Sequence, residues 1–318
     1  MQSLESQSLE SKAQDWLADP RFHRVVHRLA SGFVGVQTIA PRLASQFSTQ
    51  QRWLMCHAAL WRFFEAARAG RFGITRQEFV DAVLAYQLAS RNTAMAFFAQ
   101  ALQYGLIQPV NRGAGNGAGL VEPAGATLGA LIEWYVLHLT ALDALDGDNR
   151  ALRWREAGHP LLSELAPLVA ERLLTSEQIR APAPTYAVFA SVDDGGSLMD
   201  RLIAGLSADA SFDQERAMTN VSSVSSLARP LSLSRTHTGR TLSAAAALGG
   251  LGWCGAPGHS AIWLSRTFRL EYAAFQALKL AIIDDAFERT QASTETLGPA
   301  LPLLGREMAP EALGSQSC

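Results

Sequence analysis

Two stretches of the chain follow the same order of predicted elements, and this order limits the possible folds more than any other feature. Each stretch has a short amphipathic helix, a break, a second helix that starts at a serine, two short apolar runs around glycines, and a long apolar helix. The serines are Ser90 and Ser234, and the same offset of 144 residues superposes Gly105 on Gly249. We infer an internal repeat of architecture with little residue identity between its copies.

Capping signals predict where the helices of both copies begin. Thr75 and Glu78 have the spacing of a capping box, and Ser90 and Ser234 are good N-cap residues. Apolar periodicity and glycine stops supply the remaining elements. The expected helices include 49–70, 126–145 and 268–287, and the expected hairpins pair 106–110 with 120–122 and 251–254 with 261–264.

The length of 318 residues is enough for about two domains. Hydrophobic residues make up 48% of the chain and charged residues 18%, which fits a globular protein and excludes a disordered one. We expect a first unit over 21–147, a helical connector over 148–196 and a second unit over 197–290. The ends, 1–20 and 291–318, lack apolar periodicity and are predicted to be mobile tails.

The sequence carries no mark of export or membrane insertion. Its three cysteines have no paired spacing, which favours a reducing compartment. The polar start of the chain lacks the apolar run of a signal peptide. The longest apolar stretch, 128–145, is interrupted by Glu133, His138 and Asp143 and is shorter than a clean membrane helix. We expect a soluble, cytoplasmic protein.

A helix, a tight turn, a capped helix and a hairpin, in this order, form the plan of a winged helix-turn-helix unit. The predicted fold class is therefore mainly α, with two such units, each of three helices and a short β-hairpin wing, and with long packing helices. The segment from Val224 to Leu242 resembles the helix-turn-helix of bacterial regulators, through Leu227-Ala228 and through the leucines and serines of 231–234.

The repeated unit with its long following helix resembles the MarR-type group of transcriptional regulators. The resemblance covers roughly 75–145 and 221–287, and the second stretch matches more specifically. It implies double-stranded DNA as the partner and transcription regulation as the function. Long helices mediate dimerisation in that group, so the chain should form a homodimer or, with two units in one chain, an intramolecular pseudo-dimer.

The second unit offers the stronger set of DNA-contacting side chains. Outward positions of the helix that starts at Ser234 hold Arg235, Thr236, His237, Arg240 and Ser243, and the hairpin adds His259. These groups can donate to phosphates and to guanine. Gly239 departs from the pattern of a good helix former, and it either permits close approach to DNA or to a neighbouring helix or has no role.

The first unit makes a weaker case. Its second helix offers Arg91 and Asn92 and its wing offers Arg112, but Phe97 is predicted to lie on the same outward face. Only Lys12 and Lys279 of the 27 basic residues are lysines, a bias that suits bidentate phosphate contacts and that a GC-rich genome also produces. The formal net charge of −2 supplies no global attraction to nucleic acid.

Other chemistry finds little support in the sequence. The glycine-rich stretch 113–119 lacks the Lys-Ser/Thr of a phosphate loop, and His23 and His27 lack a third metal ligand. Asp284 and Asp285 are neighbours on a helix and point in different directions. We therefore expect no enzyme, no metal and no cofactor.

Two alternative functions stay open. Tandem winged units also occur in plasmid replication initiators, and a winged-helix protein-interaction scaffold would suit the near-neutral charge. A small-molecule effector cannot be named from the sequence, because an apolar pocket between the units is possible but no residue set marks one.

Overall fold

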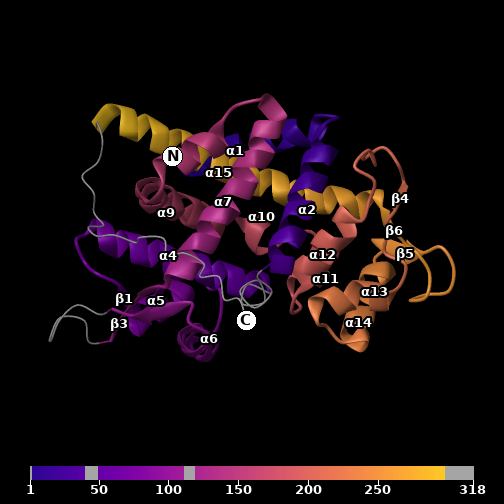
Figure 1. Ribbon diagram of the computed structural model, residues 1–318, viewed down its shortest axis with the longest axis horizontal. Coiled ribbons are helices and arrows are strands. Elements are labelled where there is room, and N and C mark those ends of the chain that lie inside the picture. The colour runs from indigo at the N-terminus through magenta and orange to yellow at the C-terminus, as the bar shows by residue number, and fades with distance from the viewer. Residues whose placement is uncertain (1, 40–48, 111–118, 298–318) are drawn as a thin grey trace, which may run out of the picture.

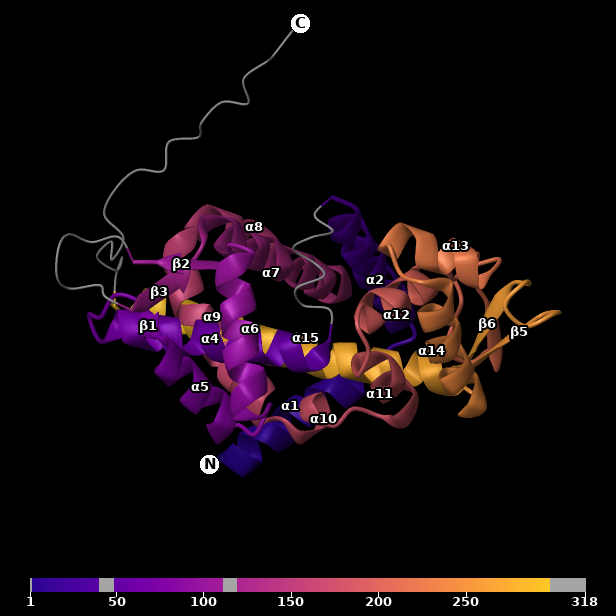
Figure 2. The ribbon, with the colours of Figure 1, turned by 90° about the horizontal axis from the view of Figure 1, so that it is seen from below.

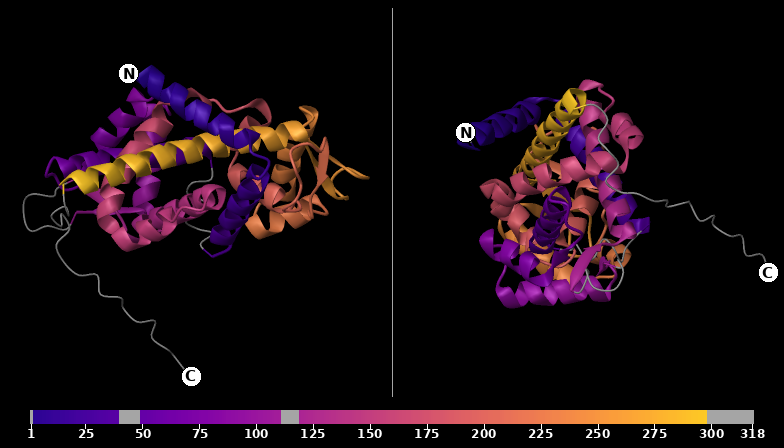
Figure 3. Two further views of the ribbon diagram at one scale, coloured as in Figure 1. Left: turned by 90° about the horizontal axis from the view of Figure 1, so that it is seen from above. Right: turned by 90° about the vertical axis from the view of Figure 1, so that its left-hand side faces the viewer.

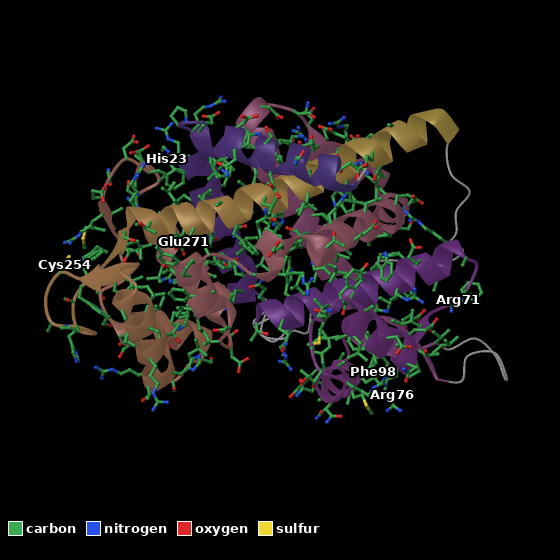
Figure 4. The ribbon with its side chains drawn as sticks, turned by 180° about the vertical axis from the view of Figure 1, so that it is seen from behind. His23, Arg71, Arg76, Phe98, Cys254 and Glu271 are labelled. Carbon is green, nitrogen blue, oxygen red and sulfur yellow. The ribbon has the colours of Figure 1, made fainter. Side chains whose placement is uncertain are left out.

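The structure is a computed structural model that describes residues 2–39, 49–110 and 119–297, and the protein is mainly helical. Two small three-stranded antiparallel sheets lie toward opposite ends of the molecule, with long helices between them (Figures 1 and 2). The labelled side chains show the same separation, since Cys254 lies at one end and Arg71 and Arg76 lie toward the other (Figure 4).

The first copy of the repeat has the order helix, strand, helix, helix and hairpin. Its elements are α4 (Gln50–Arg68), β1 (Ile74–Thr75), α5 (Arg76–Ala85), α6 (Arg91–Gln103), β2 (Ile107–Pro109) and β3 (Leu120–Pro123). The strand order is β1-β3-β2. The capping box is confirmed, because Thr75 Oγ1 accepts from the Glu78 amide at 3.1 Å and a Glu78 carboxylate oxygen accepts from the Thr75 amide at 2.7 Å.

The second copy has the same order of elements and the same order of strands. It consists of α12 (Gly195–Ala204), β4 (Arg216–Met218), α13 (Val224–Ala228), the 3₁₀ turn η1 (Arg229–Leu231), α14 (Arg235–Ala247), β5 (Leu251–Trp253) and β6 (Ile262–Ser265). Its sheet is ordered β4-β6-β5. Both predicted hairpins are present, with β2 paired to β3 and β5 paired to β6.

The remaining helices join the two copies into one packed body. They are α1 (Gln2–Ala18), α2 (Phe22–Ile39), α7 (Gly125–Asp146), α8 (Arg150–Ala157), α9 (His159–Thr175), α10 (Glu177–Arg180), α11 (Pro184–Ala190) and α15 (Arg266–Leu297). Helix α15 starts at the second sheet and runs the length of the molecule (Figure 3). Helix α2, expected to belong to the first unit, packs against α12 of the second, and α15 contacts α7 and α9. A single hydrophobic core therefore crosses the unit boundaries drawn from the sequence.

The N-terminal segment is helix α1, which corrects the prediction of a mobile tail over 1–20. Leu9 and Ala13 are buried, and α1 packs along α15. This helix is hard to predict from sequence because its few apolar residues stand among serine, glutamine and glutamate and form only a narrow apolar face. Such a helix depends on packing against a partner for its stability. At the other end, α15 continues to Leu297, past the predicted tail boundary at 291, and 298–318 lie outside the described residues.

A buried charge cluster ties α1, α8 and α15 together. The carboxylate of Asp284 is fully buried, and it lies 2.7 Å from Arg150 Nε and 2.5 Å from Lys12 Nζ. Its neighbour Asp285 points elsewhere and pairs with Arg289 at 3.0 Å, as expected for adjacent helical positions. The two cations compensate a carboxylate that would otherwise be costly to bury.

Helix α7 is long and apolar enough, by length and composition, to cross a membrane. This is weak evidence, because the core helices of soluble proteins pass the same test. Helix α7 contacts α2, α8 and α15, and its Tyr135, His138 and Leu139 are fully buried in protein. These contacts are compatible with a soluble protein.

Candidate nucleic-acid interface

Helix α14 is started and oriented by local signals in the sequence. Ser234 Oγ accepts a hydrogen bond from the His237 amide at 3.0 Å, which confirms Ser234 as the N-cap. Just before it, Ser232 adopts a left-handed conformation with φ of 56°, so the chain turns sharply between α13 and α14. The inner face of α14, which includes Leu242 and Ala245, is buried and packs on α13 and α11.

The outward face of α14 carries the side chains predicted for DNA contact. Arg235, Thr236, Arg240 and Ser243 are exposed, and their spacing places them on one side of the helix. His237 is only half-buried, and its Nε2 lies 3.3 Å from the backbone oxygen of Asp193. The five side chains therefore form one polar face, with His237 at its edge.

The hairpin adds His259 to this face. Arg235 Nη2 lies 3.0 Å from His259 Nε2, although the two residues are 24 positions apart in the chain. A guanidinium only donates hydrogen bonds, so the ring nitrogen must accept, which requires a neutral imidazole with its proton on Nδ1. The same hairpin is held against α13, because the Val224 amide donates to the Gly258 carbonyl at 3.3 Å.

The second copy carries a local positive charge that the net charge of the whole chain does not reveal. Residues 216–265 contain four arginines, Arg216, Arg229, Arg235 and Arg240, and neither aspartate nor glutamate, so this segment has a formal charge of +4 while the chain has −2. All four arginines are exposed. Arg216 stacks on the ring of Trp263, with its guanidinium carbon 4.3 Å from the ring centroid. A windowed charge count would have added Arg216 and Arg229 to the predicted site.

Acidic residues lie beside this face at His237. Asp193 and Asp194 precede α12, and Asp193 meets His237 through its backbone oxygen. Burial and the neighbouring Asp193 raise the pKa of the Asp194 carboxyl, and His237 lowers it in part. The arginines Arg235 and Arg240 have no ion-pair partner among the described residues.

The first copy presents a smaller and electrically neutral face. Ser90 is confirmed as the N-cap of α6, and Arg91 and Asn92 are exposed at its start. Its segment 74–123 has three arginines against three acidic residues, so its formal charge is zero. Arg112, the predicted wing contact, and the glycine-rich stretch 113–119 fall largely on 111–118, which lie outside the described residues.

Phe97 is buried, which corrects its predicted outward position. Its ring faces Phe79 at 6.1 Å and the Arg52 guanidinium at 5.6 Å. Met95 and Leu102 of the same helix are exposed. Because the run from Ala94 to Phe98 is apolar throughout, the sequence does not determine which face of α6 is buried. Packing against α4 and α5 determines it.

The two N-terminal histidines serve other roles in the structure. His27 Nε2 lies 3.0 Å from the backbone oxygen of Leu206, and His23 packs edge-on against Phe212. Over residues 2–39, 49–110 and 119–297, no three His, Cys, Asp or Glu side chains gather in a way that could hold a metal ion.

Comparison with known proteins found no match to a protein-family model, to a curated protein or to a solved structure. The resemblance to the MarR-type group therefore stays a prediction.

Proposed function

We propose that this protein is a sequence-specific, double-stranded DNA-binding transcription regulator, in which both copies of the repeat are winged helix-turn-helix units. The second copy makes the principal contact. Helix α14 enters the major groove, and the β5–β6 hairpin reaches the adjacent backbone or minor groove. Arg235, Thr236, His237, Arg240 and Ser243 supply the helix contacts, and His259 supplies the wing contact.

The observation that carries this proposal is the exposed arginine face of α14, joined to the hairpin through Arg235 and His259. Phosphate contacts need exposed cations, and the segment 216–265 supplies four exposed arginines with no acidic residue of its own. Arginine also fits the O6 and N7 acceptors of guanine in a bidentate way, so the same face can select sequence.

The first copy is assigned a secondary role in this proposal. Arg91, Asn92 and Arg112 can touch DNA only weakly, because the acidic residues of the copy cancel its charge. This neutrality favours a protein-interaction role for the first copy, as in the scaffold alternative. The two copies within one chain can also act as an intramolecular pseudo-dimer. A cytoplasmic location and the absence of enzymatic activity belong to the same proposal.

The deciding experiment selects binding sites from random DNA and then measures affinity for the selected duplex by fluorescence anisotropy. The variant carries Arg235→Ala and Arg240→Ala together. Its matched control carries Arg155→Ala and Arg180→Ala, which remove the same charge from the exposed sides of α8 and α10. We expect the first pair to abolish specific binding, and the control pair to leave it nearly unchanged.

The salt dependence gives a second readout. Each lost phosphate contact should reduce the slope of log affinity against log salt by about 1. The variants at α14 should therefore show a shallower slope than the control pair. If the α14 double variant binds the selected duplex as tightly as the parent protein, the proposed interface is wrong.

A further inference from the structure

A large apolar cavity lies between the two copies, where the helices of both halves meet. Its volume is about 330 Å³, and its walls come from α2, α4, α6, α7, α11, α12 and α15 as well as the first sheet. This volume falls within the range of small-molecule sites, roughly 300–1,000 Å³. The cavity is separate from the exposed face of α14, none of whose proposed contact residues line it.

Aromatic rings form one end of the cavity. Trp134 lines this end, with its ring centroid 5.6 Å from that of His57, and Phe33 and Trp53 also line the space. Burial lowers the pKa of the lining His57 to about 3, and it lowers the pKa of His138, which packs against Trp134, well below its usual value, so both imidazoles are neutral. These rings offer flat apolar surface without charge.

One cation, Lys279, reaches this aromatic end from α15. Its ammonium lies 4.9 Å from the centroid of Phe33 and 5.8 Å from that of Trp134. Lys279 is 5% exposed, and among the described residues its ammonium has neither a hydrogen-bond acceptor nor an ion-pair partner. Burial lowers the pKa of Lys279 to about 7, and the attraction of Asp200 opposes that shift. A buried ammonium without a protein acceptor is unusual, and because Lys279 lines the cavity an anionic ligand there would supply one.

Two further polar groups stand beside Lys279. The Oε1 of Gln276 is buried and has no donor within reach in the described part of the chain. Asp200, by contrast, already accepts from the Tyr272 hydroxyl at 2.5 Å, and burial raises its pKa to about 7. Lys279 can therefore pair with an anionic ligand, and the Gln276 oxygen can accept from a donor on the body of the same ligand.

We propose that this cavity is a binding site for a small carboxylate with a flat apolar body, whose carboxylate pairs with Lys279 and whose body lies among Trp53, Trp134 and Phe33. A cationic ligand is disfavoured, because Lys279 would repel it and Asp200 already has a donor. A carboxylate balances the charge of Lys279, and Asp200 can then remain protonated at the same site. The proposal does not depend on DNA binding.

The test uses three probes of one shape and different charge: 2-naphthoate, 2-naphthamide and 2-naphthylmethylammonium. Isothermal titration calorimetry on the full chain measures each affinity. We expect 2-naphthoate to bind about tenfold or more tightly than 2-naphthamide, because a hydrogen bond between two ions is roughly twice as strong as one to the neutral amide oxygen. Equal affinities of these two probes, tightest binding of the cation, or no binding of 2-naphthoate would each overturn the proposal.

The chain offers a matched pair of lysine variants, because Lys12 and Lys279 are its only lysines. Lys279→Met should lower the affinity for 2-naphthoate about tenfold and remove the preference over 2-naphthamide. Lys12→Met should leave both affinities unchanged, since Lys12 lies on α1 and does not line the cavity. If the Lys279→Met variant still binds 2-naphthoate more tightly than 2-naphthamide by the same factor, the proposed pairing of the carboxylate with Lys279 is wrong.

A measurement on the parent protein decides the matter even if Lys279→Met fails to fold. At pH 8 the bound carboxylate should raise the pKa of Lys279 and of Asp200, so that 2-naphthoate binding takes up protons from the buffer. The neutral 2-naphthamide should not. Calorimetry in phosphate and in Tris, which differ in ionisation enthalpy, measures this uptake, and its absence with 2-naphthoate would contradict a carboxylate seated beside these groups.

Discussion

Arg235 Nη2 and His259 Nε2 lie 3.0 Å apart, which joins the start of α14 to the tip region of the β5–β6 hairpin. Neither residue needs the other to fold, because both are exposed. Their contact instead links the hairpin to the helix within the surface proposed to face DNA.

This contact predicts coupled effects on DNA affinity. Arg235→Ala and His259→Ala should each weaken binding of the selected duplex, and the double variant should lose less than the sum of the two losses. The difference should be about 0.5–1 kcal/mol, and unfolding free energies should change by less than about 0.5 kcal/mol because both side chains are exposed. Fluorescence anisotropy on the four proteins of this double-mutant cycle gives the coupling energy, and strictly additive losses would show that the pair does not act together.

Gly239 provides a second test on the same face of α14. A Cβ at this position would meet only Val224 Cγ1, at 4.0 Å, so packing between helices does not require glycine here. Gly239→Ala should therefore raise the free energy of unfolding by about 1 kcal/mol. If DNA approaches this face closely, as proposed, the same substitution should weaken DNA binding.

The control for Gly239→Ala is Gly252→Ala in β5. There a Cβ would lie 2.3 Å from the ring of Trp263, so this variant should be destabilised. Urea unfolding compares the stabilities, and anisotropy compares the DNA affinities. A Gly239→Ala variant that is stabilised and binds DNA as tightly as the parent would show that this face of α14 is not in close contact with the groove.

The buried charge cluster predicts a large loss of stability. Asp284→Ala removes the fully buried carboxylate that Arg150 and Lys12 share, while Arg150 keeps its ion pair with Asp146, so the variant should lose about 1.5–3 kcal/mol of unfolding free energy. Asp285→Ala breaks only the partly exposed pair with Arg289 and should cost less than about 1 kcal/mol. Urea denaturation measures both values, and similar costs for the two variants would contradict a structural role for Asp284.

The buried Lys279 predicts a pH dependence of stability with a definite sign. Its pKa is lowered to about 7 by burial, so between pH 7 and pH 9 the unfolded chain binds more protons than the folded one. The free energy of unfolding should therefore rise with pH over this interval because of Lys279. The gain should be largest toward pH 9, at up to about 1.4 kcal/mol per pH unit, and Lys279→Met should lack it.

Lys12→Met is again the control. The pKa of Lys12 is raised by its partners Asp284 and Glu288, in opposition to burial, so Lys12 titrates above this interval in both states. Urea denaturation at pH 7, 8 and 9 compares the three proteins. If the parent and Lys279→Met show the same change in stability with pH, Lys279 does not titrate near neutral pH.

The sequence by itself determined the local parts of this protein. Thr75, Ser90 and Ser234 cap helices through hydrogen bonds that span only three residues, and the hairpins and their order in each copy follow from equally local patterns. The exposure of Arg235 and Arg240 followed from the same periodicity. Such features are readable because the interacting groups are neighbours in the chain.

Only the tertiary structure decided what depends on distant partners. Helix α1 is stabilised because Leu9 and Ala13 are buried where α1 packs against α15. The buried face of α6 is determined by the contacts of Phe97 with α4 and α5. The cavity collects residues from Phe33 to Lys279, which no window of sequence contains together. The burial of apolar side chains joins elements that are far apart in the chain. For this reason the sequence alone predicted neither the packing of α2 and α15 across both copies nor the position of the Lys279 ammonium in the cavity.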